Sequence, residues 1–265
     1  MKRIFVDQLE RRVNLSSFPP KRIVSLVPSQ TELLFSLGLD QEVAGITKFC
    51  VHPEKQFRAK PRVGGTKALH LEEIAALKPD LVIANKEEND QEQIAWLEER
   101  FPVWISDVRT IDHALEMIRR VGEMVGKAEA ATALSFRLQG QFAKLRTEKW
   151  PVKRAAYLIW SGPLMVAAAN TFIDAMMRHA GFKNAFAHLP RYPEVSEEDL
   201  RKAAPEVILL PSEPYPFSEK HLSLFKEICP ESVIRLVDGE LFSWYGSRMQ
   251  DFPPYIRTLR KDLDI

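Results

Sequence analysis

Two side chains with metal-binding chemistry, Cys50 and His52, lie two residues apart in the segment KFCVHP. In an extended segment, residues i and i+2 point to the same side, so both could reach one metal ion. Two ligands alone do not make a tight site, and a simple loop histidine is the commoner case. The sequence has no C-x-x-C pair, no H-E-x-x-H motif and no clustered histidines, so we expect no zinc site built only from protein ligands.

The chain has two cysteines, Cys50 and Cys229. This number is too small for a disulfide framework. A bridge between them cannot be inferred without knowing the distance between their Cα atoms. We therefore expect two free, partly buried thiols.

Two glutamates, Glu72 and Glu198, occupy the same place in a repeated pattern. The segment LEEIAALKPDLVIANK at 71–86 aligns through its proline with SEEDLRKAAPEVILLP at 196–211. Each copy predicts an acidic helix start, a short helix that ends at the proline and a buried strand. The helix dipole stabilises a carboxylate in the first turn by about 0.3–1 kcal/mol, which would by itself explain each glutamate.

Continuous apolar runs alternate with helical segments in the first half, after an opening IFVDQLERRVNL that favours a small hairpin. Helices are expected after the capping boxes that begin at Ser29 and Asn89, and the first of them ends at Gly38. The expected buried strands are 23–28, 43–47, 81–85 and 103–107.

The second half repeats this plan. Capping boxes at Thr171 and Ser196 start two of its helices. The expected strands are 155–160, 164–169, 207–211 and 233–238, and the expected helices are near 171–180, 197–204 and 218–227. Uninterrupted apolar strands that alternate with helices indicate parallel sheets covered on both faces.

Residues 128–148 predict one long helix, about 30 Å at ~1.5 Å per residue. Its apolar face contains Leu134, Leu138, Phe142 and Leu145, all at helical spacing.

A packed helix holds two lobes more rigidly than a flexible linker does, so we expect only a small opening and closing motion. Gly122 and Gly126 are expected to mark the break before the helix. The predicted fold is α/β: two small doubly wound, mainly parallel-sheet lobes at 1–109 and 151–265, joined by a bridging helical segment at 110–150.

Charge and hydropathy exclude two classes of protein. The 265 residues are 45% hydrophobic and 28% charged, and 37 basic and 36 acidic residues give a net charge of +1. A nucleic-acid binder usually has a basic excess on one face, so none is expected here. Charges interrupt the N-terminal segment, and no run approaches the ~20 apolar residues of a membrane span. We expect neither a secretion signal nor membrane insertion.

Three segments together resemble the helical-backbone metal-receptor family, the substrate-binding proteins of ABC importers. They are KRIVSLVPSQTELLFSLGL, RVGGTKALHLEEIAALKPDLVIANK and EVSEEDLRKAAPEVILL. The likeness is nearest to the vitamin B12-binding members. It implies a fold like that of class III periplasmic binding proteins, and a monomer with no catalytic activity and no cofactor of its own. It also implies a metal chelate as ligand, first a corrinoid and second haem or a ferric siderophore.

The resemblance also implies a ligand held between the lobes by loops at the carboxyl ends of the strands, where open α/β sheets generally bind ligands. Aromatic side chains with a few donors would suit the flat face and polar rim of a corrin or porphyrin. The expected ligand-binding residues are Phe49, Cys50, His52, Gly65, Thr66, Asn85, Lys86, Trp160, Arg191, Tyr192, Tyr215, Trp244, Tyr245 and Arg248.

Several of these residues also have a structural interpretation. Trp160 closes an apolar strand and fits a core as well as a ligand site, whereas SWYG at 243–246 looks exposed. The cations of these loops either recognise an anionic chelate through charge-assisted hydrogen bonds or are simply solvated. They are Arg62, Lys67, Lys86, Arg191 and Arg248.

For Glu72 and Glu198 the resemblance implies docking onto arginines of the two permease subunits. A protein with two similar lobes would meet a symmetric permease dimer through equivalent surfaces. The resemblance also implies a periplasmic or cell-surface location, whereas Met1 as the native start would imply a cytoplasmic one.

One segment departs from the family, and one rival function remains. NKEEND at 85–90 is acidic where the B12 binders offer an aromatic residue, and Glu87 and Glu88 would repel an anionic siderophore. The rival is a cytosolic two-lobed enzyme acting on a tetrapyrrole, such as a chelatase, with His52 or His188 opposite Glu194. A dinucleotide enzyme or a serine hydrolase is not expected, because the sequence has no G-x-G-x-x-G, no P-loop and no G-x-S-x-G.

Overall fold

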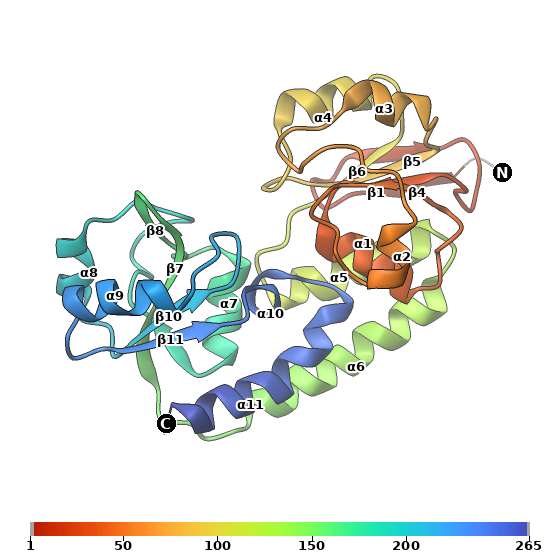
Figure 1. The fold of residues 1–265 in the computed structure, drawn as a ribbon. Helices are drawn as coiled ribbons and strands as arrows, with labels where there is room; N and C mark the ends of the chain where they lie inside the picture. The colour runs from red at the N-terminus through yellow and green to blue at the C-terminus, as the bar shows by residue number, and fades with distance from the viewer. Residues whose placement is uncertain (1–2, 264–265) are drawn as a thin grey trace. The chain divides into compact units, whose positions relative to one another are not determined.

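The computed structural model describes residues 3–263, which form an α/β protein (Figure 1). The chain divides into two compact units. The N-terminal unit contains the chain to Val108, Asp112–Gln139 and Tyr245–Arg248. The C-terminal unit contains Arg109–Ile111, Gly140–Trp244 and the chain from Met249. The division falls within α6 (Ala128–Arg146), so the predicted bridging segment contributes to both units.

The N-terminal unit contains a parallel four-stranded sheet in the order β4-β3-β5-β6. Because all four strands are parallel, their carboxyl ends meet at one edge, where ligands of open α/β sheets bind. The strands are β3 (Ile23–Ser25), β4 (Val43–Ile46), β5 (Leu81–Asn85) and β6 (Val103–Ser106). The predicted opening hairpin is present as the antiparallel pair β1 (Arg3–Val6) and β2 (Arg12–Leu15).

Helices cover both faces of this sheet, with α3 and α4 on one face and α1 on the other (Figure 1). Ile74 of α3 and Leu97 of α4 belong to one core cluster with Val24, Val82 and Ile105 of the strands. The helices are α1 (Pro28–Ser36), α2 (Glu54–Arg58), α3 (Leu71–Ala76), α4 (Gln91–Glu98) and α5 (Ile111–Met124).

The C-terminal unit has a second sheet in the order β11-β10-β7-β8, with β9 also paired to β7. All its strands are parallel except β8, which runs antiparallel to β7. They are β7 (Lys153–Ser161), β8 (Leu164–Val166), β9 (Phe182–Asn184), β10 (Val207–Pro211) and β11 (Val233–Val237). The sequence predicted four strands in this unit and missed β9. The three residues of β9 include an exposed lysine and contain no apolar run.

Two helices pack against one face of this second sheet. Leu200 of α8 and Phe225 of α9 share a core cluster with Ala156, Leu158 and Ile208 of the strands. The helices are α7 (Phe172–His179), α8 (Glu197–Ala203), α9 (Leu222–Ile228), α10 (Gly239–Ser243) and α11 (Phe252–Asp262), with 3₁₀ turns η1 (Glu219–His221) and η2 (Ser247–Asp251). The predicted α/β class with two mainly parallel sheets is confirmed.

Of the four predicted capping boxes, the one at Ser196 forms in full on α8, and the one at Thr171 is present as an N-cap hydrogen bond from the Asp174 N–H on α7. The box at Ser29 is wrong, because α1 begins at Pro28 with Val27 at the N-cap position, two residues before Ser29, and has no side-chain cap. The cap of α4 is Asp90 and not its neighbour Asn89.

The predicted long helix is α6, and its expected apolar face is buried. Gly126, with φ +75°, forms the break before it. Gly122 is not a break but lies inside α5, where a Cβ would come within 2.0 Å of the Ala131 Cβ. It therefore allows α5 and α6 to pack closely. Over residues 3–263, no helix has the length and apolar character needed to span a bilayer.

Candidate functional site

The two copies of the repeated pattern fold in the same way, as α3 followed by β5 and as α8 followed by β10. In each copy the residue before the proline is left-handed: Lys78 has φ +47° and Ala204 has φ +43°. Non-glycine residues rarely adopt this region, so its use at matching positions is a specific structural likeness. The structure therefore supports placing Glu72 and Glu198 at equivalent positions.

In each copy, an arginine at the start of the neighbouring central strand donates a hydrogen bond to the end of the helix. Arg22 donates from Nε to the Leu77 carbonyl at 2.7 Å, and Arg154 donates to the Ala203 carbonyl at 2.6 Å. Both carbonyls lie at the end of the helix in their copy, where backbone acceptors lack helical partners. Each arginine thus satisfies a helix terminus.

A carboxylate completes this contact in both units. Asp80 accepts from the Arg22 N–H at 2.9 Å, and Glu206 accepts from the Arg154 N–H at 2.9 Å. The Arg154 N–H is also the main reason that the pKa of Glu206 is lowered. We call each set, Arg22 with Asp80 and Arg154 with Glu206, a strand-start clasp. The clasps fix the helices that carry Glu72 and Glu198 to their sheets.

Glu72 and Glu198 are both exposed, but their surroundings differ. Glu198 forms an ion pair with Lys202 at 2.6 Å, one turn later on α8. The matching position in the first copy is Ala76, which cannot form such a pair. Glu72 therefore has no lysine one turn later on its helix, whereas Glu198 has Lys202.

At the carboxyl end of β5, Asn85 is buried and its amide is used within the protein. It donates to Ser106 Oγ at 2.9 Å and accepts from the Glu87 N–H at 2.8 Å. Lys86, next along the chain, forms an ion pair with Asp107 at 3.3 Å. Asn85 shapes the turn after the strand, whereas the exposed stem of Lys86 remains accessible.

Cys50 is buried whereas His52 is partly exposed, so the two side chains do not lie on one exposed face where both could reach a metal ion. Cys50 is buried, and its Sγ lies 3.2 Å from Thr31 Oγ1 and 3.3 Å from Thr47 Oγ1. Burial raises the pKa of this thiol. Cys229 is likewise free and buried. Among residues 3–263, the structure has no cluster of three or more His, Cys, Asp or Glu residues fit to hold a metal ion.

Phe49 is the most exposed of the predicted aromatic residues, at 51%. The Lys48 ammonium lies 5.1 Å from its ring centroid. Gly65 lies beneath this pair, and a Cβ there would come within 3.2 Å of the Phe49 ring. Thr66 accepts from Asn89 Nδ2 at 3.0 Å through its carbonyl. This loop therefore presents an aromatic ring and a cation together.

The expectation that the SWYG segment is exposed is wrong. Tyr245 is buried and donates from its hydroxyl to Glu88 Oε1 at 3.0 Å. Burial, with the nearby Glu88 charge, raises the pKa of this phenol well above its ordinary value. Arg248 binds Glu32 through two hydrogen bonds of 2.9 and 2.8 Å.

The other cations also have partners. Lys67 donates to the Asn89 carbonyl at 3.2 Å. Arg62 lies over the Phe57 ring at 4.9 Å. Few of the expected cations are thus simply solvated.

In the C-terminal unit, Trp160 and Tyr215 are brought together. Their ring centroids are 5.4 Å apart at 70°, an edge-to-face contact, and Trp160 is 42% exposed. The two rings come from the end of β7 and the loop after β10. Arg191 and Tyr192 lie in another loop, with the guanidinium 5.8 Å from the tyrosine ring centroid.

Sequence reasoning missed Glu213, which holds the buried Trp244. Its Oε1 accepts from Trp244 Nε1 at 2.6 Å and from Ser243 Oγ at 2.9 Å. Burial raises the pKa of Glu213, with smaller effects from Glu240 and Asp238. Its position two residues after a predicted strand was the available signal.

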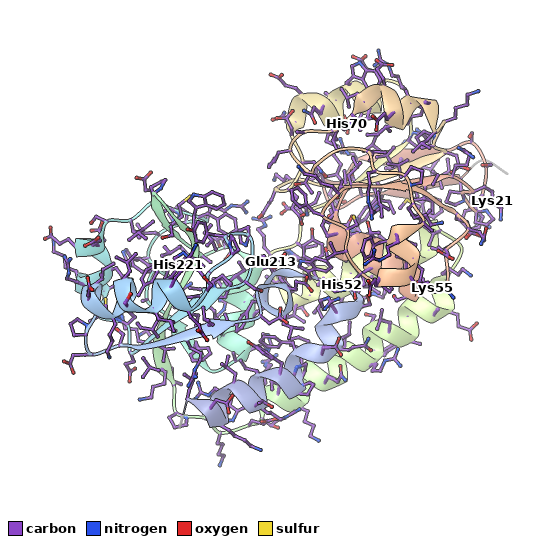
Figure 2. The ribbon with its side chains drawn as sticks, in the orientation of Figure 1. Lys21, His52, Lys55, His70, Glu213 and His221 are labelled. Atoms are coloured by element: carbon purple, nitrogen blue, oxygen red, sulfur yellow. The ribbon has the colours of Figure 1, made fainter. Side chains whose placement is uncertain are left out.

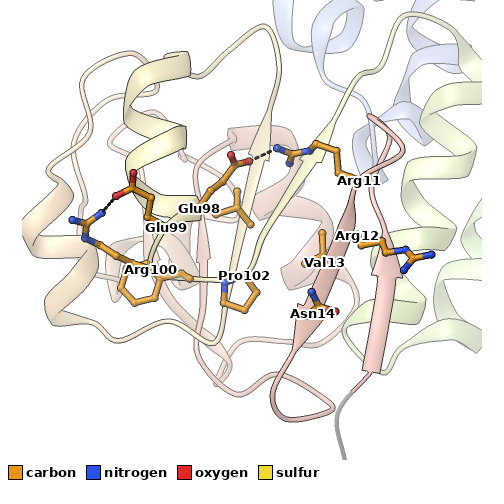
Figure 3. A pocket seen from close by; sticks show the side chains of 10 residues that line it. Arg11, Arg12, Val13, Asn14, Glu98, Glu99, Arg100 and Pro102 are labelled. Carbon is orange, nitrogen blue, oxygen red and sulfur yellow. Dashed lines mark hydrogen bonds and ion pairs between the residues drawn. The ribbon is translucent and has the colours of Figure 1, made fainter.

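A cavity of about 460 Å³ lies apart from all these residues, in the N-terminal unit (Figure 3). Ion pairs join Arg11 to Glu98 and Arg100 to Glu99 at its wall. It contains none of the predicted ligand-binding residues and has a mixed-charge lining. We assign it no part in the site.

Comparison with known proteins identifies the class to which these two α/β units belong. The Vitamin B12-binding protein of Photorhabdus laumondii is 28% identical over 197 residues, which cover 72% of this chain and 70% of that protein. The periplasmic vitamin B12 binding protein BtuF of Vibrio cholerae has the same fold, with a TM-score of 0.78, 22% identity and coverage of 93% of this chain and 98% of that one. The periplasmic heme-binding protein RhuT from Roseiflexus sp. RS-1 gives a TM-score of 0.75, 24% identity and coverage of 90% and 96%.

Residues 23–224 match the family described as Periplasmic binding protein, and this chain belongs to that family. The expected family resemblance is confirmed. The chain is a solute-binding protein and not an enzyme, so the chelatase alternative is not favoured.

Proposed function

We propose that this protein binds a metal chelate and delivers it to an ABC importer. A corrinoid is the first candidate and haem or a ferric siderophore the second. The observation that carries the proposal is the family match over residues 23–224, together with a relative named as a vitamin B12-binding protein. The chelate is a ligand that is taken up and released, and the protein needs no cofactor of its own.

The ligand-binding residues come from the loops at the carboxyl ends of the strands in each unit. In the N-terminal unit, Phe49 and Lys86 are the exposed members of the predicted set, and Lys48, which was not predicted, lies beside the Phe49 ring. In the C-terminal unit they are Trp160, Tyr215 and the Arg191 loop. Aromatic faces with a few polar groups suit a flat macrocycle. Asn85, Cys50, Tyr245 and Arg248 support these loops from within the protein.

Delivery uses Glu72 and Glu198 as docking residues for the permease dimer. The support is that both are exposed, and that each is carried on a helix held by the same strand-start clasp. Equivalent carboxylates on two similar units fit a symmetric dimer. The protein acts as a monomer in the periplasm or at the cell surface.

A titration tests the ligand. Cyanocobalamin, hemin and a ferric trihydroxamate are added separately to the purified protein, and tryptophan fluorescence quenching reports binding. We expect saturable quenching at one equivalent by at least one of the three. Absence of quenching with all three contradicts the proposal.

A further inference from the structure

An aromatic cluster in the C-terminal unit runs from the core to the surface around Tyr215. The Tyr215 ring centroid lies 4.6 Å from that of Phe217, which is buried in the core, and 5.4 Å from that of Trp160. His221, which is labelled in Figure 2, adds a third contact. Its ring centroid lies 5.5 Å from that of Tyr215. The rings fix the plane of Tyr215 while Trp160 remains 42% exposed.

The tautomer of His221 follows from its hydrogen bonds. Its Nδ1 accepts from the Ser218 backbone N–H at 3.0 Å. Because a backbone N–H can only donate, Nδ1 carries no proton in this arrangement, and the neutral ring has its proton on Nε2. The Ser218 hydroxyl at 3.3 Å from Nδ1 is compatible with the same tautomer. The Ser218 carbonyl oxygen also lies 3.2 Å from Nδ1, and the contact with the Ser218 N–H is the shorter of the two backbone contacts.

This tautomer determines what the Tyr215 hydroxyl can do. Nε2 lies 3.3 Å from the Tyr215 oxygen, so the histidine donates and the phenol accepts. The proton of the phenol is then directed elsewhere. Within residues 3–263, the structure gives the Tyr215 hydroxyl no acceptor for that proton. Tyr215 is therefore a hydrogen-bond donor held in position and available to a bound molecule.

We infer that Trp160 and Tyr215 form a ligand platform in the C-terminal unit, and that His221 is the residue that positions the Tyr215 hydroxyl as its donor. The class of ligand is a flat conjugated macrocycle with oxygen acceptors on its rim, either carboxylates or amides. The ring pair supplies apolar stacking area, and the phenol supplies one hydrogen bond to the rim. A hydroxamate siderophore lacks the wide conjugated face. This inference rests on the proposed function and narrows its ligand.

A double-mutant cycle tests the role of His221. Hemin and cyanocobalamin are titrated against the wild-type protein, Tyr215→Phe, His221→Phe and the double variant. Tyr215→Phe keeps the ring and removes the donor, so affinity for the bound macrocycle should fall about fivefold to tenfold, the size of one hydrogen bond. Because His221 acts through that hydroxyl, His221→Phe should have no further effect once Tyr215 is Phe. His221→Gln, which has both an acceptor and a donor, should restore most of the loss.

A matched control separates this role from general loosening. Tyr255→Phe removes a hydroxyl that contacts the Asp238 N–H in the same unit, and it should leave affinity unchanged. Additive losses in the cycle, an equal loss in Tyr255→Phe, or binding of a ferric trihydroxamate alone would overturn the inference while the proposed function stands. If the wild-type protein binds none of the three compounds, the proposed function fails as well.

Discussion

The first copy of the repeated unit, α3 with β5, and the second, α8 with β10, share a backbone arrangement but not a surface. Both have a strand-start clasp and a left-handed residue before the proline. Their helix starts differ, because Ser196 caps α8 whereas His70, at the start of α3, provides no side-chain cap. Their exposed charges differ too, since Lys202 pairs with Glu198 and Ala76 stands at the matching place.

The comparison shows that the contacts fixing each helix to its sheet are conserved between the copies, whereas the side chains exposed on each helix are not. The clasps act on backbone groups, which every sequence provides, so they can be repeated while the side chains around them change. The positions of Glu72 and Glu198 are therefore set alike, whereas their electrostatic surroundings are not. If the two glutamates dock to one symmetric partner, they should do so with unequal strength.

Reversing both charges should have the largest effect. In the double variant Glu72→Lys with Glu198→Lys, we expect stimulation of ATP hydrolysis by the cognate importer to be lost, because two attractive contacts become repulsive. Ligand affinity of the isolated protein should not change. Both quantities can be measured on the same preparation, the first with the importer in vesicles and the second by fluorescence titration.

The neighbouring glutamates give a matched control. Glu73→Lys with Glu197→Lys makes the same change of charge on the same two helices. If this control abolishes stimulation equally, the effect is one of general surface charge and the paired docking role is wrong. A loss of ligand affinity in the first variant would instead assign Glu72 and Glu198 to the ligand site.

Removing the clasp arginines should destabilise the two units to different extents. Arg154 also donates to the Ala185 carbonyl at 3.2 Å and is half-buried, whereas Arg22 is exposed. We expect Arg154→Ala to cost about 2 kcal/mol and Arg22→Ala about 1 kcal/mol. Hydrogen exchange of β10 and β5 amides measures the two units separately. Lys21→Ala, which removes an exposed side chain, should cost less than about 0.5 kcal/mol, and equal costs for all three would refute the clasps.

Two carboxylates around β10 should give opposite pH dependences. Burial raises the pKa of Glu213, so its contribution to stability is present at low pH and is lost as pH rises through its folded-state pKa. Hydrogen bonding lowers the pKa of Glu206, so its contribution is present above the unfolded value and is lost as pH falls. In urea unfolding from pH 4 to 8, Glu213→Gln should therefore gain stability relative to the wild type as pH rises, and Glu206→Gln should lose it. The same trend in both variants would contradict these assignments.

Much of the fold could be predicted from the sequence, because long apolar runs and strong turn residues carry it. The strands β5 and β10 begin and end where the sequence predicts. What failed depends on packing: β9 is a short strand with no apolar run, and Gly122 serves a close approach of two helices that spacing cannot reveal. The caps failed for a related reason: at α4 the neighbouring Asp90 caps the helix in place of Asn89, and α1 begins at Pro28, so that Ser29 lies inside its first turn.

The candidate site was less predictable, because sequence gives side-chain type but not burial. Trp244 and Tyr245 follow a glycine-containing segment and look exposed, yet each is buried and donates to a carboxylate, Glu213 and Glu88 respectively. Neither carboxylate could be paired with its aromatic partner from spacing, because each pair joins distant parts of the chain. The contact of Trp160 with Tyr215 likewise depends on the neighbouring places of β7 and β10 in the sheet.

The smallest effect should come from removing the lysine beside Glu198 or introducing one beside Glu72. Lys202 competes with a partner cation for Glu198, and an exposed pair of this kind is worth about 0.3–0.5 kcal/mol. Lys202→Ala should therefore lower the concentration for half-maximal importer stimulation by about twofold. Ala76→Lys introduces the same competitor beside Glu72 and should raise that concentration by a similar factor. Opposite shifts of the half-maximal concentration in the two variants would mean that the two copies dock with different strength because of the residue at positions 76 and 202. Shifts in the same direction would mean that a lysine on these helices acts on the permease directly and not through Glu72 or Glu198.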